Sequence, residues 1–222
     1  MNSESPNGSE ISNSTWIEWF LSLRGNEFFC EIDEEYILDR FNLAGLHAEV
    51  KYYSQAFELI TDSLEDELDP AMWDEVEKSA RHLYGLIHAR FVITNRGLSK
   101  MLEKFKACEF GRCPRVFCHN QTVLPVGLSD SCGNKGVKLY CPRCEDVYSP
   151  ISKKHAAVDG AYFGTSLPHL LLQMFPTMAP QKTIERYVPR IFGFRLHQFA
   201  EEQRKQDHIR EDIARMAQGF EE

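Results

Sequence analysis

Four cysteines in two close pairs constrain this chain more than any other feature of its sequence. Four residues separate Cys113 from Cys118, two separate Cys141 from Cys144, and 22 residues lie between the pairs. This separation lets the chain fold back as a ribbon that directs four thiolates at one ion, and Zn²⁺ is the ion that such a set typically holds. Four protein ligands leave no position for a reactive water, so the spacing predicts one structural zinc ion per chain.

Spacing alone leaves a second assignment of the first pair open. Cys108 lies five positions before Cys113 and could pair with it in place of Cys118. We favour Cys113 with Cys118, because both pairs then begin with the string Cys-Pro-Arg, in which proline sets the backbone dihedral φ at the bend. Cys30 and Cys132 are expected to be a small buried hydrophobe and a loop thiol.

Charge is unevenly distributed along the chain. Residues 58–77 contain nine acids and no Lys or Arg, whereas residues 100–154 contain ten bases and five acids, which suggests two modules. The formal net charge of -8 makes a general nucleic-acid coat a poor fit. No basic segment precedes an apolar core at the beginning, and no apolar run approaches the roughly 18 residues of a bilayer span, so we expect an intracellular protein without membrane contact and with reduced cysteines.

The first half of the chain is predicted to be helical. Residues 1–14 are too polar to bury much surface and are expected to form a flexible tail. The string Thr15-Trp16-Ile17-Glu18 has the form of a capping box that starts a helix. Two further short helices are predicted, one after Asp33 and one over residues 53–60.

A long helix is predicted to follow the acidic stretch. Asp69 suits an N-cap and Pro70 suits the first helical position. From there apolar residues recur at steps of three, four or seven up to Phe105, as a single buried stripe would. Gly85 and Gly97 are the positions where such a helix would bend or break.

The second half of the chain is predicted to form short strands and a charged C-terminal segment. Short β-prone pieces are predicted over residues 122–124, 137–140 and 147–148, separated by Gly, Pro and Cys. Residues 199–222 are mostly charged with a thin apolar seam, which favours a marginal helix or a solvated tail over a helix that binds a partner.

No catalytic motif is recognisable in the sequence. It contains no Gly-rich phosphate loop, no dinucleotide fingerprint and no kinase catalytic set. His82, His88 and His169 fit satisfied polar groups at a helix edge better than catalytic bases. The acids of residues 65–69 lie in a predicted solvated loop, where nothing would raise the pKa of a carboxylate. We therefore expect a protein that is not an enzyme.

Several long strings resemble the casein kinase II regulatory beta subunit. They are WIEWFLSLRGNEFFC (residues 16–30), LYGLIHARFVITNRG (83–97), DGAYFG (159–164) and VPRIFGFRLH (188–197), together with the spacing of the four cysteines. The similarity runs from about residue 15 to residue 197, broken only in the acidic loop and near residues 176–186.

This resemblance implies a helical domain joined to a zinc ribbon that dimerises, within a tetramer of two regulatory and two catalytic subunits of an acidophilic Ser/Thr kinase of cytoplasm and nucleus. Such a regulatory subunit performs no chemistry, stabilises the catalytic subunit and selects its protein substrates. By similarity Cys113, Cys118, Cys141 and Cys144 are the zinc ligands, which agrees with the pairing favoured above.

The resemblance also implies a docking site for the kinase. The family docks through an aromatic-Gly-Phe hairpin, matched by Phe192 and Phe194 around Gly193. Two aromatics beside a glycine that permits a tight turn have the character of a binding hot spot, although both could instead belong to a local core. By resemblance Arg190, Leu196 and Leu170 line the same contact.

The acidic loop, residues 62–69, matches a family region that binds polyamines or basic proteins. Its carboxylates would attract multivalent cations in a salt-dependent way, and they belong to Asp62, Glu65, Asp66, Glu67 and Asp69. Family members carry N-terminal serines that the kinase phosphorylates, but here neither Ser3 nor Ser5 has an acid three positions later. Ser63, followed by Glu65 and Asp66, is a better acidophilic phosphosite.

The predicted fold class is α+β, with an N-terminal all-α helical domain, a zinc-ribbon β domain built on the four cysteines and a C-terminal extended or hairpin docking tail. Its predicted parts are a disordered tail over 1–14, a helical domain over 15–107, a zinc-ribbon dimerisation domain over 108–165, a kinase-docking segment over 166–198 and a charged tail, helical or disordered, over 199–222.

Two other functions are compatible with the sequence. A zinc-ribbon nucleic-acid or transcription module would use the ten bases of residues 100–154, but four zinc thiolates offset part of that charge, and the aromatics are not interleaved with the bases. A diverged relative that dimerises without binding kinase is the other, and the retained hairpin argues against it.

Overall fold

The protein is described from a computed structural model that covers residues 14–65, 69–182, 188, 190–195 and 197–218. The chain divides into two compact units, one ending at Lys182 and the other beginning at Thr183, and each is treated by itself. The mixed helix and sheet content, with a cluster of four cysteines, confirms the predicted α+β class.

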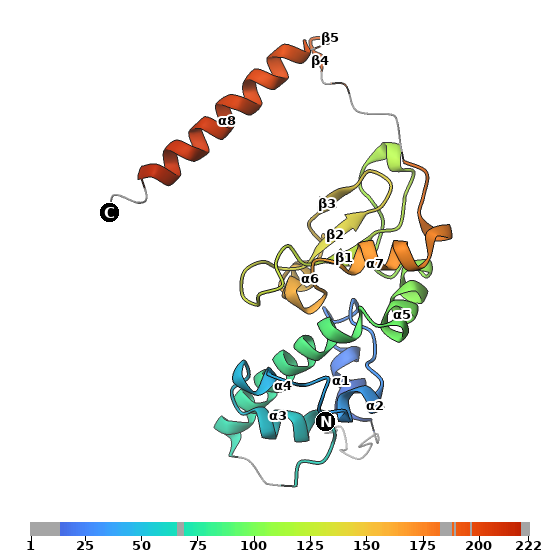
Figure 1. Ribbon diagram of the computed structural model, residues 1–222, viewed down its shortest axis with the longest axis vertical. Helices are drawn as coiled ribbons and strands as arrows, with labels where there is room; N and C mark the ends of the chain where they lie inside the picture. The colour runs from blue at the N-terminus through green and yellow to red at the C-terminus, as the bar shows by residue number, and fades with distance from the viewer. Residues whose placement is uncertain (1–13, 66–68, 183–187, 189, 196, 219–222) are drawn as a thin grey trace, which may run out of the picture. The chain divides into compact units, whose positions relative to one another are not determined.

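The first part of the larger unit is helical (Figure 1). Its helices are α1 Trp16–Ser22, α2 Glu34–Leu38, α3 Tyr53–Ile60, α4 Pro70–Phe91 and α5 Asn95–Lys106. The predicted capping box is confirmed, because the Thr15 hydroxyl accepts from the Glu18 N–H while the Glu18 carboxylate accepts from the Thr15 N–H. The bounds of α3 and the start of α4 also agree with the sequence prediction.

The long apolar stripe is divided between two helices. The interruption lies at neither Gly85 nor Gly97, the two positions predicted for it. α4 ends at Phe91, and Thr94, in an extended conformation, caps α5 by accepting from the Gly97 N–H at 3.1 Å. Gly97 is required for close approach instead, since a Cβ there would lie 2.1 Å from the Phe91 carbonyl oxygen. At Gly85 a Cβ would lie 2.5 Å from the ring of Tyr162, so this glycine admits a neighbour and does not end the helix.

Side chains of α4 hold an irregular segment in the core. The Tyr84 hydroxyl donates to the Cys30 carbonyl at 3.2 Å and lies 3.3 Å from the Ile32 N–H, and His88 receives the Cys30 N–H. The segment around Cys30 has no helix or strand of its own, so these bonds satisfy buried backbone groups that would otherwise cost free energy. Aromatic rings close the core, with Trp16 stacked on Phe20 at a centroid distance of 5.2 Å.

A small antiparallel sheet follows, in the order β1 Leu124–Val126, β2 Lys138–Cys141, β3 Asp146–Tyr148. The second and third strands lie where the sequence predicts them. The first begins later than predicted, because Thr122 forms only an isolated bridge with Arg112. The short helix α6 Lys153–Ala156, the 3-10 turn η3 Gly160–Tyr162 and α7 Leu167–Met174 complete this unit, with α7 against β1 and α5 (Figure 1).

The smaller unit contains a hairpin and a helix. Strands β4 Arg190–Ile191 and β5 Phe194–Arg195 are joined through Phe192 and Gly193, both with positive φ (49° and 86°), as in a type I′ turn. The charged segment that follows forms α8 Gln198–Gln218. Within the described residues, no helix combines the length and the apolar character needed to cross a lipid bilayer.

Candidate metal centre

Four cysteine sulfurs converge at one buried point. The Sγ atoms of Cys113, Cys118, Cys141 and Cys144 all lie within 4.8 Å of one another, and Cys113 to Cys144 and Cys118 to Cys141 are each 3.9 Å. Zinc bound at about 2.3 Å in a tetrahedron holds sulfurs roughly 3.8 Å apart, whereas a disulfide would bring two of them to about 2.05 Å. The donor set therefore fits a tetrahedral metal ion, and zinc in particular.

Tight turns orient the four cysteine side chains toward one point. The Cys113 N–H donates to the Gln121 carbonyl at 2.7 Å, and Cys118 ends the 3-10 turn η2 Val116–Cys118, after which His119 has a positive φ. Cys141 ends β2 and Cys144 lies in the turn before β3. Burial raises the pKa of the Cys141 thiol in the metal-free chain, and the backbone N–H groups of Cys144 and Arg143 oppose this effect in part.

The other cysteines lie outside the cluster. Cys108 has its Sγ 3.2 Å from the Thr122 hydroxyl, so the structure does not bring it into the rival pairing with Cys113. Burial raises the pKa of the Cys30 thiol to about 12 and that of the Cys132 thiol to about 11, which leaves both as neutral thiols at neutral pH.

His88 lies in the core and not at a helix edge, contrary to the sequence prediction. Its Nδ1 is 2.7 Å from the Tyr162 carbonyl, which can only accept, so Nδ1 carries the proton and Nε2 accepts from the Cys30 N–H at 3.1 Å. Burial lowers the pKa of His88 to about 4, so the ring is neutral at physiological pH.

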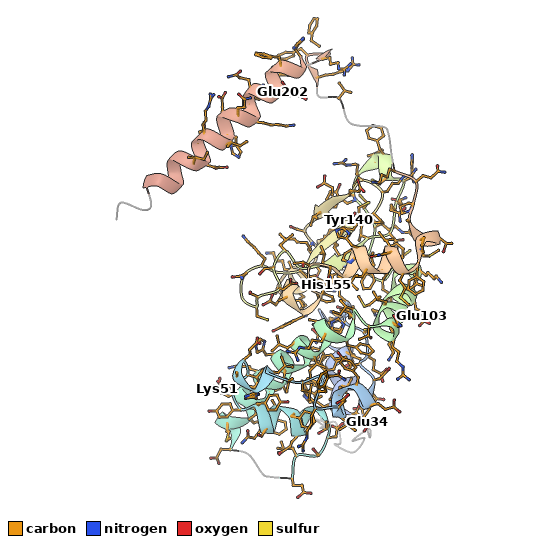
Figure 2. The ribbon with its side chains drawn as sticks, in the orientation of Figure 1. Glu34, Lys51, Glu103, Tyr140, His155 and Glu202 are labelled. Atoms are coloured by element: carbon orange, nitrogen blue, oxygen red, sulfur yellow. The ribbon has the colours of Figure 1, made fainter. Side chains whose placement is uncertain are left out.

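The two other histidines also have structural partners. His82 Nδ1 lies 2.9 Å from the Tyr162 hydroxyl, and the His169 ring packs edge-on against Tyr140 (labelled in Figure 2). The His82 contact gives a ring nitrogen a hydrogen-bond partner, which agrees with its interpretation as a satisfied polar group.

The hairpin residues are solvent-exposed. Phe192 is 97% and Phe194 79% exposed, so within the smaller unit neither belongs to a local core. Arg190 is also exposed and reaches the Gly193 carbonyl at 3.4 Å. Leu170 is half-buried in α7, in the larger unit, and Leu196 lies outside the described residues.

The acidic loop is only partly available to ligands. The Asp62 carboxylate accepts the Trp16 N–H at 2.9 Å, and so it is used at the start of α1. Glu65 and Asp69 are exposed, while Asp66 and Glu67 lie outside the described residues. Ser63 is exposed, and its hydroxyl is 2.8 Å from that of Thr61.

Sequence spacing does not reveal two contacts made here. Asp62 reaches Trp16 across 46 positions, and the Tyr148 hydroxyl lies 3.3 Å from the Cys144 sulfur. A hydrogen-bonding aromatic four residues after a ligand cysteine is the one signal that would have pointed to Tyr148.

A helical region followed by a small sheet with four buried, convergent thiols defines a mixed α and β protein with a candidate metal site. Comparison with known proteins identifies the family. The family model for the casein kinase II regulatory subunit matches residues 15–195. The chain belongs to the casein kinase II regulatory subunit family.

Curated relatives agree over most of their length. The chain is 59% identical to casein kinase II subunit beta of Schizosaccharomyces pombe over 206 residues, which covers 93% of this chain and 89% of that protein. It is 55% identical to subunit beta-2 of Neurospora crassa over 202 residues (91% and 71%), and 51% identical to subunit beta' of Saccharomyces cerevisiae over 196 residues (86% and 76%). The chain is thus a regulatory, non-catalytic subunit of this family.

Proposed function

We propose that this chain dimerises through its metal-stabilised sheet and joins two catalytic subunits in a tetramer, where it stabilises the kinase and tunes its choice of protein substrates. One zinc ion per chain, held by Cys113, Cys118, Cys141 and Cys144, gives the sheet its stability. The observation that carries the proposal is an exposed aromatic hairpin on a chain of this family.

Exposed apolar side chains beside the metal ligands support the dimer. Val116, between Cys113 and Cys118, is 83% exposed, and Val147, three positions after Cys144, is exposed as well. Both valines flank the cysteine pairs, and we propose that they belong to the surface that a second subunit covers.

Phe192 and Phe194 supply the anchors for the catalytic subunit, with support from Arg190, Leu196 and Leu170. The type I′ turn fixes the backbone between the two rings, so little conformational entropy is lost when they enter a pocket. Substituting such an anchor by alanine typically costs more than about 2 kcal/mol, or about 30-fold in Kd.

We expect the Phe192→Ala and Phe194→Ala variants each to weaken binding of the catalytic subunit by at least this factor, measured by calorimetry on the full-length chain. Phe199→Ala is a matched control, because Phe199 is 68% exposed but lies on α8 outside the hairpin. Binding by both hairpin variants with the affinity of the unmodified chain would contradict the docking site.

The acidic loop is proposed to bind polyamines or basic protein segments through Glu65, Asp66, Glu67 and Asp69, with Asp62 contributing less because it is engaged with α1. Attraction of this kind weakens as salt rises, since the Glu65 and Asp69 carboxylates are at the surface.

Ser63 is proposed as a phosphosite. It is exposed at the end of α3, and acids follow it at the second and third positions. Incubation with the catalytic subunit and ATP should place phosphate on Ser63, detected by mass spectrometry, while Ser99, which is exposed but has no acid at the second or third following position, stays unmodified. Phosphate confined to the N-terminal serines would reject the assignment.

A further inference from the structure

The side chains around the four sulfurs differ between the two cysteine pairs. Arg115, in the first pair, forms an ion pair with Asp146 Oδ2 at 2.9 Å, just beyond the second pair. Arg143, its counterpart in the second pair, has a buried Nε with no hydrogen-bond partner among the described residues. The repeated Cys-Pro-Arg string therefore gives two unlike halves of one site.

Tyr148 continues the Arg115 side of this arrangement. Its hydroxyl lies 3.3 Å from the Cys144 sulfur, and the same phenol group interacts with the positive charge of Arg115, whose pKa it raises. Strand β3 fixes the ring, because Tyr148 pairs with Leu139 of β2 and forms part of the wall of an apolar cavity of about 390 Å³. A contact chain thus runs from Arg115 through Tyr148 to Cys144, crossing from one pair to the other.

A cysteine that binds a metal does so as a thiolate, which only accepts hydrogen bonds. The Tyr148 phenol must then be the donor to Cys144. Such a donor withdraws negative charge from the sulfur and fixes its direction, so the sulfur is a poorer target for a competing proton or chelator. Removing a residue that hydrogen-bonds to a metal ligand, without itself touching the metal, typically lowers metal affinity by 10–100-fold.

We propose that Tyr148 is a positioning residue of the metal centre, which holds Cys144 on the ion through its hydroxyl and is itself supported by Arg115. This inference rests on the proposed zinc site and adds to it a determinant of how firmly the ion is held. The Tyr148 hydroxyl, not its ring, carries the effect.

The test is a Tyr148→Phe variant of the full-length chain, in which the ring and its cavity wall are kept. Zinc transfer to a chromophoric chelator gives the dissociation constant and the release rate. The absorption bands of the Co²⁺-loaded protein show whether four thiolates still surround the metal at saturation. We expect 10–100-fold weaker zinc binding and correspondingly faster release.

Tyr140→Phe is the matched control. Tyr140 lies in the adjacent strand β2 and packs against His169, and in the described structure no hydrogen bond joins its hydroxyl to a sulfur. It should hold zinc as the unmodified chain does. Equal affinity of all three proteins, or equal weakening of both variants, would overturn the role of Tyr148. Failure of the unmodified chain to bind zinc would instead overturn the metal site itself.

Discussion

A Cys141→Ser chain is expected to contain no stoichiometric zinc, to lose its small sheet and to be unable to form the dimer. Cys141 ends the central strand β2 and is fully buried, so its loss removes one ligand and leaves three convergent thiols without an ion. Structural zinc contributes about 10–16 kcal/mol of apparent binding free energy in small zinc modules, which is as large as the whole stability of a typical domain. Elemental analysis, circular dichroism and analytical ultracentrifugation measure the three losses.

Two cysteine variants separate ligand loss from general damage. Cys108→Ser removes the thiol of the rival pairing, and Cys132→Ser removes a loop thiol, yet both should retain one zinc per chain and the dimer. A Cys141→Ser protein that keeps its zinc, or an unmodified protein that stays folded and dimeric after its metal is stripped, would refute the structural role of the ion.

Features set by neighbouring residues could be predicted from the sequence. The capping box at Thr15 needs only Glu18 three positions on, and the start of α4 needs only Asp69 followed by Pro70. The four clustered cysteines were predictable for a related reason, because each pair is local and one long loop brings the two together.

Features set by tertiary contact could not be predicted in this way. The break after Phe91 depends on Thr94 acting as a cap, although a continuous apolar stripe passes through it. The engagement of Asp62 with Trp16, and that of His88 with both Cys30 and Tyr162, join segments 46 to 74 positions apart. A pattern of polar and apolar residues shows which side chains are buried, but it does not show which distant backbone group each will meet.

The free energy of unfolding is expected to fall as the pH drops from about 6.5 to about 4, in part because of His88. Burial lowers the pKa of this ring from an ordinary value of 6.5 to about 4 in the folded chain, with the Tyr162 carbonyl opposing burial and Lys104 adding to it. The unfolded chain therefore takes up the proton first. Neutral His88 therefore makes its full contribution to the free energy of unfolding above pH 6.5. This contribution, about 3 kcal/mol, is lost as the pH falls from 6.5 to 4, and below pH 4 it changes no further.

A His88→Gln variant isolates this contribution from acid release of the metal. Both proteins carry the same four cysteines, so metal loss at low pH affects both, and the difference between their urea unfolding curves belongs to residue 88. At pH 7 the variant should be less stable by about 2 kcal/mol, because glutamine cannot place its donor and acceptor where the two ring nitrogens meet Tyr162 and Cys30.

Because glutamine at position 88 does not titrate, the deficit should shrink as the pH falls and should disappear or reverse near pH 4, where the unmodified chain has lost about 3 kcal/mol. His169→Gln, a substitution of an exposed histidine on α7, should run parallel to the unmodified chain at every pH. A deficit of constant size from pH 7 to pH 4 in the His88→Gln chain would mean that His88 takes up its proton at the same pH in the folded chain as in the unfolded chain, and so becomes doubly protonated within the fold as the pH falls. The assignment of its two nitrogens would then be wrong, because a doubly protonated ring cannot accept the Cys30 N–H.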